Sequence, residues 1–147
     1  MPNRKQVTRG EVIQHVRKFL GTPWRHQTHD CLFPVIEVNR YFGLTPFTGS
    51  GPYALWPPPG RLRAMLERYL TPVPRPHWPP ENLNVADVAI FQLGRHPIHV
   101  GVIANGAAPF SMIHSYANLG RMVEHVIDDK WGRRIAFVYR FEGLLDG

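Results

Sequence analysis

The sequence predicts an α+β fold in which N-terminal helices pack on an antiparallel β-sheet of about five strands. In the first forty residues the apolar positions recur at helical spacing, whereas from residue 88 onward they alternate with polar ones. A hairpin signal, Asn105-Gly106, lies between two of the alternating segments. Helices followed by a run of strands are typical of the α+β class. A chain of 147 residues is expected to form one domain, 1–147.

The two N-terminal helices have recognisable starts. Thr8 and Glu11 have the spacing of a capping box at the head of the first apolar stripe. Asp30 suits the N-cap of a second helix running to about Phe42, because its carboxylate can accept amide hydrogens of the first turn. Pro34 is compatible with that turn, where amide hydrogens have no intrahelical acceptor. In the first helix the residues that recur at helical intervals are Val12, Ile13, Val16, Phe19 and Leu20, and Gly21-Thr22-Pro23 is expected to end it. The buried stripe of the second is expected to be Leu32, Val35, Ile36 and Phe42.

Residues 46–80 have a different composition and contain ten of the fifteen prolines. The segment is too apolar and aromatic for a flexible tether, so we expect a long ordered excursion from the core. One short helix is expected within it, with Leu62, Met65, Leu66 and Tyr69 on its apolar face.

Five segments after the excursion have the alternation and the flanking turn residues of strands. They are Val88–Phe91, His99–Ala104, Phe110–Ser115, Met122–Ile127 and Ile135–Phe141.

Composition and charge exclude several classes of protein. A single cysteine excludes an intrachain disulfide framework. No apolar run approaches the roughly 20 residues of a membrane span, so no membrane insertion is expected. The polar N-terminus carries no secretory signal, which predicts synthesis in the cytoplasm. The net charge of +6 is scattered rather than gathered in a stripe, which argues against specific nucleic-acid recognition.

Cys31 is the first candidate for chemistry. It follows the expected N-cap Asp30, and the positive end of a helix dipole together with free amide hydrogens stabilises a thiolate. The same amides can bind an oxyanion on a substrate carbonyl. The alternative is a small buried hydrophobic residue, as most lone cysteines are.

His99 and His114 lie in two strands joined through the hairpin signal. A loop of two residues or of four places both imidazoles on one face of the sheet, whereas a loop of three separates them. On one face they form a base with an orienting partner, which needs only a thiol packed against it.

His96 and His99 allow a metal interpretation, because Cys31 and His114 would complete a tetrahedral zinc site. We favour a site without metal, since strand alternation allows His96 and His99 to diverge. The remaining histidines are expected to be surface residues or satisfied partners (His15, His77, His125) or to border the cleft (His26, His29). Asp87 is expected to be a turn residue or cap.

Five motifs in chain order resemble those of NlpC-type cell-wall cysteine peptidases, specifically the compact branch found in phage tails and gene transfer agents. The resemblance runs from about residue 8 to 141 and is weakest between 46 and 80. The motifs are Leu20-Gly21-Thr22-Pro23-Trp24-Arg25 (LGTPYR in the family), Asp30-Cys31 (the nucleophile), Ala86-Asp87-Val88-Ala89-Ile90-Phe91 (GDVLLF), His99-Val100-Gly101-Val102-Ile103 (HVGIY) and Met112-Ile113-His114-Ser115 (FIHA).

The resemblance implies a papain-like NlpC-type fold and hydrolysis of an amide in the peptidoglycan stem peptide, often between D-glutamate and a diamino acid. It implies that Cys31 is the nucleophile, that His99 is the general base and then acid, and that His114 orients His99. The backbone amide of Cys31 would contribute to the oxyanion hole. Around this Cys-His-His triad, Trp24, Arg25 and His29 are expected in the substrate cleft, and no cofactor or metal is expected.

The sequence departs from the family pattern at three places beside the nucleophile. Leu32 and Phe33 replace the usual serine and glycine after the cysteine, and Trp24 replaces a tyrosine. The loop before the cysteine is shortened to residues 27–29. These departures leave the triad intact and bear on substrate fit and oxyanion geometry.

The resemblance therefore predicts an enzyme that is assembled into a phage or phage-like tail, contacts tail hub or tip proteins and opens the cell wall during DNA delivery. Three alternatives stay open. The first is a catalytically idle tail-tip protein that keeps the fold, and the second is a zinc-dependent hydrolase or zinc-stabilised fold. The third is a thiol acyltransferase or deacylase acting on another amide.

Overall fold

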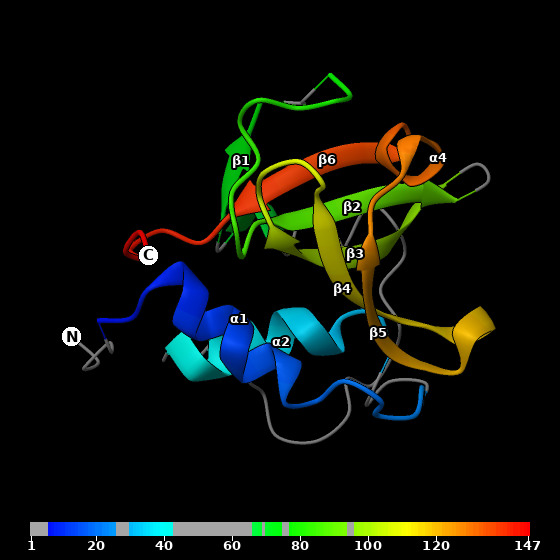
Figure 1. Ribbon diagram of the computed structural model, residues 1–147, viewed down its shortest axis with the longest axis horizontal. Helices are drawn as coiled ribbons and strands as arrows, with labels where there is room; N and C mark the ends of the chain where they lie inside the picture. The colour runs from blue at the N-terminus through cyan, green and yellow to red at the C-terminus, as the bar shows by residue number, and fades with distance from the viewer. Residues whose placement is uncertain (1–5, 26–29, 43–65, 69, 75–76, 94–95) are drawn as a thin grey trace.

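The computed structural model describes residues 6–25, 30–42, 66–68, 70–74, 77–93 and 96–147. Helices α1 (Arg9–Arg17) and α2 (Phe33–Phe42) lie side by side and cover one face of a six-stranded antiparallel sheet (Figure 1). The strand order is β1-β6-β2-β3-β4-β5. The strands are β1 (Thr71–Val73), β2 (Val88–Leu93), β3 (His96–Asn105), β4 (Ser111–Tyr116), β5 (Arg121–Val126) and β6 (Ile135–Arg140), with a 3-10 helix η1 (Ala117–Leu119) before β5 and a short helix α4 (Asp129–Gly132) before β6. The α+β prediction is confirmed.

Helix α1 begins as its capping box predicts. The Thr8 side chain accepts a hydrogen bond from the Glu11 amide at 3.1 Å. The helix ends at Arg17, whose guanidinium donates two hydrogen bonds to Glu124, at 2.8 and 3.0 Å, and so ties α1 to β5. The helical spacing was expected to continue to Leu20, but the chain turns after Arg17 and leaves Leu20 40% exposed.

Helix α2 is the central helix and is buried on nearly all sides, Glu37 and Asn39 included. Its regular turns begin at Phe33 rather than at Asp30. Asp30 nevertheless acts as a cap, because its carboxylate accepts the Leu32 amide at 3.1 Å and its carbonyl accepts the Phe33 amide at 3.0 Å. The predicted N-terminal signal was therefore correct, and the turn it stabilises is residues 30–32.

The sixth strand, β1, lies inside the proline-rich stretch and was missed by the sequence analysis. It pairs with β6 at the edge of the sheet, where Pro72 faces Tyr139. A proline fits an edge strand because its missing amide hydrogen interrupts no ladder on the open side. Most of residues 46–80 lies outside the described residues, as do three of the four positions expected on the helix face there; Leu66 is buried.

The hairpin between β3 and β4 has a longer loop than either length considered from the sequence. Val102 pairs with Ile113 and Ile103 with Met112, and an irregularity follows before Asn105. The Asn105 side chain donates to the Pro109 carbonyl at 2.9 Å and accepts the Ala107 amide at 3.4 Å, and these bonds hold the wider loop. The observed register still places His99 and His114 on one face, as predicted.

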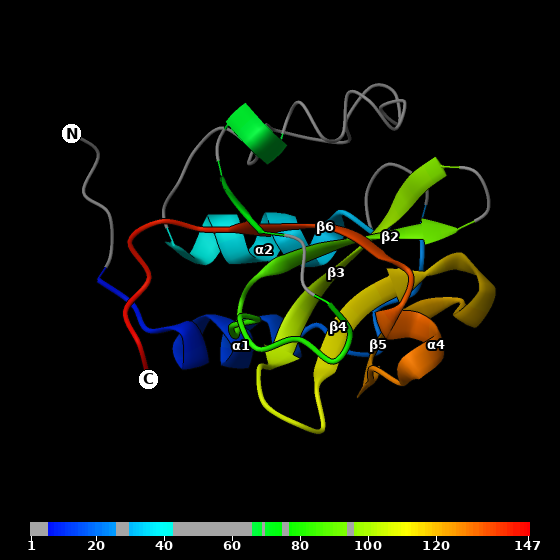
Figure 2. The same cartoon turned by 90° about the horizontal axis from the view of Figure 1, so that it is seen from above.

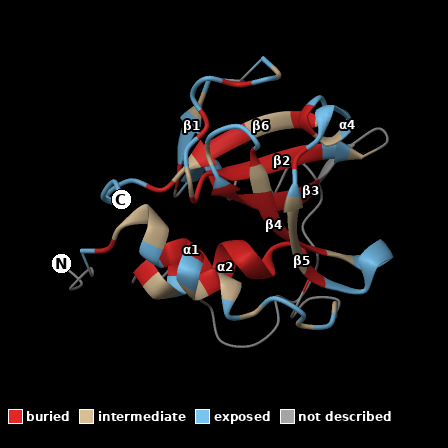
Figure 3. Ribbon diagram, in the orientation of Figure 1, coloured by how far each residue is buried: buried red, intermediate tan, exposed pale blue. Residues whose placement is uncertain are grey.

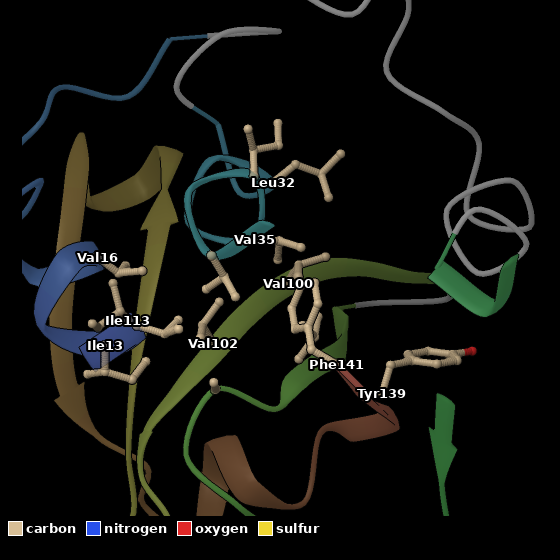
Figure 4. Packing of buried hydrophobic residues seen from close by; sticks show 14 of the residues in the cluster. Ile13, Val16, Leu32, Val35, Val100, Val102, Ile113, Tyr139 and Phe141 are labelled. Atoms are coloured by element: carbon tan, nitrogen blue, oxygen red, sulfur yellow. The ribbon is translucent and has the colours of Figure 1, made fainter. Parts of the chain in front are cut away.

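The sheet carries a hydrophobic layer on each face. On the helix side, residues of α1 and α2 pack on alternate residues of the strands, and Figure 4 shows Val35 beside Val100 and Val102, with Ile13 and Val16 near Ile113. Figure 3 shows the buried residues concentrated between the helices and the sheet. The second layer, on the opposite face, contains Phe91, Ile103 and Met112, with Trp131 of α4 packed against it.

Asp87 anchors the start of β2. Its carboxylate accepts two hydrogen bonds from Arg140, at 2.9 and 2.8 Å, and one from the Asn84 amide at 2.8 Å. The side chain is completely buried. The sequence analysis identified the turn-capping role, and the structure adds an ion pair that joins β2 to β6.

Candidate active site

Three elements bring the candidate residues to one end of the molecule. The start of α2, the start of β3 and helix α4 all lie at the same end in both ribbon views (Figures 1 and 2). Cys31 precedes α2, and His99 is near the start of β3. His114 and Tyr116 are in the last half of β4, on the neighbouring strand.

The structure places the Cys31 thiol against β3, at the residue after His99. The sulfur accepts hydrogen bonds from the backbone N–H groups of Val100 and of Cys31 itself. Val100 therefore lies on β3 two residues before Val102, where the paired register with β4 begins. Cys31 is 7% exposed and is a free cysteine.

The surroundings of Cys31 favour the neutral thiol. Burial raises the pKa of the Cys31 thiol, the neighbouring carboxylate of Asp30 raises it further, and the N–H groups of Val100 and Cys31 lower it. The expectation that the helix start would favour the thiolate is therefore opposed by burial and by the residue that caps the turn.

His99 and His114 are in direct contact, as the resemblance implies for a base and its orienting residue. His99 Nε2 lies 2.6 Å from His114 Nδ1. This bond occupies the Nε2 side of the His99 ring, so Nδ1 is the nitrogen available to a thiol or a substrate. Both side chains are buried, and His114 is completely so.

The structure adds a third imidazole that the sequence analysis set aside. His114 Nε2 lies 2.7 Å from His125 Nε2, and His125 Nδ1 lies 2.8 Å from the carbonyl oxygen of Val126. His125 is on β5, where Met112 of β4 faces it, and it therefore lies diagonally from His114 on the same face. It is a satisfied partner, one of the two roles expected for it, and its partner is His114.

Aromatic side chains enclose the three histidines. The Trp131 ring centroid lies 5.8, 5.4 and 5.8 Å from those of His99, His114 and His125. Tyr116 is stacked on His114, with centroids 5.6 Å apart, and also contacts His99. Neither residue carried a motif signal, because their role depends on how α4 folds back over the sheet.

This enclosure keeps the imidazoles neutral. The pKa of His99 is lowered to about 4, chiefly by burial and to a lesser extent by the charge of His125. Burial lowers the pKa of His114 to about 2, with the charges of His99 and His125 as the lesser causes. At neutral pH both rings are therefore uncharged, as a base awaiting a proton must be.

The residues expected in the cleft are only partly described. The Trp24 amide donates to the Gly120 carbonyl at 2.9 Å, which holds this residue at the β4–β5 connection, the end of the sheet where Tyr116 lies. Trp24 is half-buried and Arg25 is exposed. His29 and His26 lie outside the described residues.

The two bulky residues after Cys31 are buried. Leu32 is 3% exposed and Phe33 is 7% exposed, and both belong to the helix-side hydrophobic layer. The Phe33 ring packs edge-on against Phe19, with centroids 5.4 Å apart. Neither bulky side chain is therefore exposed at the surface.

Two further histidines, His15 and His77, lie outside the series of His99, His114 and His125. His15 stacks on Tyr41 with centroids 4.6 Å apart, and His77 is exposed. Within the described part of the chain, no three His, Cys, Asp or Glu side chains gather as metal ligands would. Among the helices formed by those residues, none has the length and apolar character to cross a membrane.

A cavity of about 390 Å³ lies away from the histidines. It is lined from α1, the end of α2 and the C-terminal residue, including His15, Lys18 and Tyr41. None of its lining residues belongs to the cluster around Cys31 and His99.

Comparison with known proteins supports the fold. The chain resembles a solved structure of an NlpC/P60 family protein from Bacillus cereus ATCC 10987, with a TM-score of 0.61 and 18% sequence identity. The match covers 93% of this chain and 41% of that one, so this chain spans about two fifths of its structural neighbour. No protein-family model and no curated protein matches the sequence. The expected NlpC-type fold is therefore confirmed.

Proposed function

We propose that the chain is a cysteine peptidase or amidase that cleaves an amide bond in the peptidoglycan stem peptide. The observation that carries the proposal is the arrangement at the start of β3. The Cys31 sulfur accepts the Val100 amide, and the neighbouring residue His99 is held by His114 through Nε2 at 2.6 Å. A thiol, a base and an orienting group in this order are the parts of a nucleophilic triad.

In the proposed reaction, the Cys31 thiol gives its proton to His99 Nδ1 while the sulfur attacks the substrate carbonyl carbon. The C–N bond then breaks, the amine leaves with the proton returned by His99, and an acyl-enzyme remains. Water deprotonated by His99 hydrolyses the thioester and restores the thiol. No cofactor is needed for these steps.

The backbone at the helix start offers one donor for the oxyanion. Asp30 accepts the amides of both Leu32 and Phe33, whereas the Cys31 amide acts on its own sulfur and lowers the pKa of the thiol. That amide is next to the point of attack, so it would donate to the negative oxygen of the tetrahedral intermediate.

Both reacting groups are neutral in the free protein, which defines how the thiol is activated. The pKa of Cys31 is raised and that of His99 is lowered to about 4, so a separated thiolate and imidazolium is unfavourable at neutral pH. Proton transfer then accompanies attack on the substrate, and His99 acts as a general base.

The substrate and the setting rest on resemblance. The five motifs are those of NlpC-type enzymes, and the structural neighbour belongs to the NlpC/P60 family. The net charge of +6 suits an anionic wall. Because the motifs resemble those of the phage-tail and gene-transfer-agent branch, we propose that the protein is made in the host cytoplasm, assembled into such a tail and bound to hub or tip proteins.

The second candidate is a catalytically idle tail-tip protein that retains the fold. The raised pKa of the buried Cys31 thiol favours it, because a protonated thiol is a poor nucleophile. It predicts that particles carrying Cys31→Ala deliver DNA normally, whereas an enzyme predicts impaired delivery.

The direct test is digestion of purified peptidoglycan and of synthetic stem peptides, with amine release and fragments read by mass spectrometry. We expect wild type to release peptide fragments, Cys31→Ala to release none, and His77→Gln, which removes an exposed imidazole, to behave as wild type. Equal release by wild type and Cys31→Ala, or none by folded wild type across pH and substrates, refutes the assignment. Transfer of the acyl group to an amine instead of water would identify an acyltransferase.

A further inference from the structure

The three buried or half-buried histidines form a hydrogen-bonded series with a fixed end. From His99 the series passes through His114 to His125, with N···N distances of 2.6 and 2.7 Å, and it ends at the Val126 carbonyl, 2.8 Å from His125 Nδ1. A carbonyl oxygen can only accept a hydrogen bond. His125 must therefore carry its proton on Nδ1.

This end point determines the tautomer of every ring in the series. A neutral His125 with hydrogen on Nδ1 presents an unprotonated Nε2, so His114 must donate from its own Nε2. The Nδ1 of His114 is then unprotonated and must accept from His99 Nε2. His99 is left with a bare Nδ1, which is the form a general base needs.

We propose that His125 is a positioning residue of the catalytic machinery, which sets the tautomer of His99 through His114 and receives the proton taken from the thiol. This inference rests on the proposed function for its catalytic part, whereas the tautomers are a property of the free protein.

The proton transfer balances along the series. The Cys31 S–H bond breaks and a His99 Nδ1–H bond forms, the His99 Nε2 proton passes to His114 Nδ1, and the His114 Nε2 proton passes to His125 Nε2. His99 and His114 end neutral, His125 ends as the cation, and the sulfur carries the new negative charge or bond. When the C–N bond breaks, the His99 Nδ1 proton passes to the leaving nitrogen, and the two transfers between the imidazoles reverse.

The burial of the three rings explains why the charge rests on His125. His99 is 4% exposed and His114 is completely buried, whereas His125 is half-buried and its neighbour Val126 is 55% exposed. A charge is better solvated at the outer ring. The charge of His125 also lowers the pKa of both inner histidines, so the series takes up one extra proton as a unit.

The groups around His125 are compatible with a shared cation. Among the described residues beside the series, Tyr116 of β4 is stacked on His114, and the guanidinium of Arg134 lies 5.6 Å from the centre of the Trp131 ring. Glu124, the preceding residue on β5, is held by Arg17 of α1. The Trp131 ring contacts all three imidazoles and can stabilise an imidazolium through its π face.

The first experiment is ¹⁵N NMR of histidine-labelled wild type at pH 7.5, which distinguishes the two neutral tautomers and needs no substrate. We expect the Nε2–H form for His99 and His114 and the Nδ1–H form for His125. The opposite tautomer at His125 or at His99 overturns the proposal, whether or not the protein cleaves peptidoglycan.

The second experiment compares His125→Gln and His125→Phe with wild type and with His77→Gln as the matched control. A glutamine carbonyl can still accept the His114 proton, but it cannot take up a proton, whereas phenylalanine can do neither. We expect the plateau rate of Cys31 alkylation by iodoacetamide to fall about 10-fold in His125→Gln and about 100-fold in His125→Phe.

The pH profile separates this role from a structural one. In wild type the acid limb of alkylation reports protonation of the histidine series, since a charged series accepts no further proton. In His125→Gln the acid limb of alkylation moves to lower pH by about one unit or more. The pH profile of kcat for any cleavage shifts in the same direction, while KM is unchanged. His77→Gln keeps the wild-type limb. If the acid limb and the plateau rate of His125→Gln are identical to those of wild type, the proposed proton transfer to His125 is overturned. If wild type also cleaves stem peptides in that case, the proposed function still stands.

Discussion

Acid should unfold this protein through its buried histidines. His99 has a pKa of about 4 in the folded chain and His114 one of about 2, against a usual value of 6.5. The unfolded chain therefore binds more protons than the folded one below pH 6.5, and the free energy of unfolding falls as the pH falls. Above pH 6.5 both forms are neutral, and these residues give no pH dependence.

The size of the effect follows from the pKa differences. His99 alone removes about 2 kcal/mol by pH 5 and about 3 kcal/mol by pH 4, and His114 adds a similar amount. A loss of about 6 kcal/mol from the pair at pH 4 is comparable to the whole stability of a small domain. We therefore expect the folded state to be lost between about pH 5 and 4.

The assay is urea unfolding followed by tryptophan fluorescence and circular dichroism at half-unit steps from pH 8 to 4. His99→Gln removes one titrating group, so its free energy of unfolding should fall by about 3 kcal/mol less than that of wild type between pH 7 and 4. The exposed His77 provides the control, because His77→Gln should follow the wild-type curve. A wild-type free energy of unfolding that is equal at pH 7 and pH 5 would refute the reasoning.

Two carboxylates provide further predictions, with Asp146→Asn, at an exposed carboxylate, as the common control. Asp30→Asn should lower the pKa of Cys31 and speed its alkylation at pH 8, because the amide keeps an oxygen for the turn and removes the charge that raises the thiol pKa; an unchanged alkylation profile contradicts this cause. Asp87→Ala should cost about 3 kcal/mol in urea unfolding, because it leaves Arg140 without its buried partner; a midpoint equal to that of the control would show that the pair is not stabilising.

The helix caps and the strands could be predicted because they depend on local sequence. The Thr8 cap, the Asp30 cap and the alternation of the strands depend on residues within a few positions of one another, and the structure confirms each of them. The face shared by His99 and His114 was also predictable, because alternation survives a change of loop length by an even number of residues.

Features that depend on distant pairing were not predictable. β1 was missed because Pro72 argues against a strand unless the segment is known to lie at a sheet edge. The hairpin loop was misjudged because the Asn105 side chain holds a wider turn than the Asn105-Gly106 pair indicates. The sequence contained a weak signal for His125, because alternation along the predicted strand Met122–Ile127 determines which face of the sheet it lies on. Its contact with His114, however, depends on the register of β4 and β5.

The site combines two requirements that conflict in most settings. Catalysis by a neutral thiol and imidazole needs a base that is uncharged at working pH, and burial under Trp131 provides it by lowering the pKa of His99. The same burial opposes the charge that the base must then accept. A single buried histidine would face that cost alone, whereas the series through His114 carries the charge outward to the half-buried His125. The acid sensitivity of the fold and the ability of His99 to act as a base thus have one physical cause, the burial of the series. A substitution that exposes the series to water should make the fold less sensitive to acid and should also make His99 a less effective base.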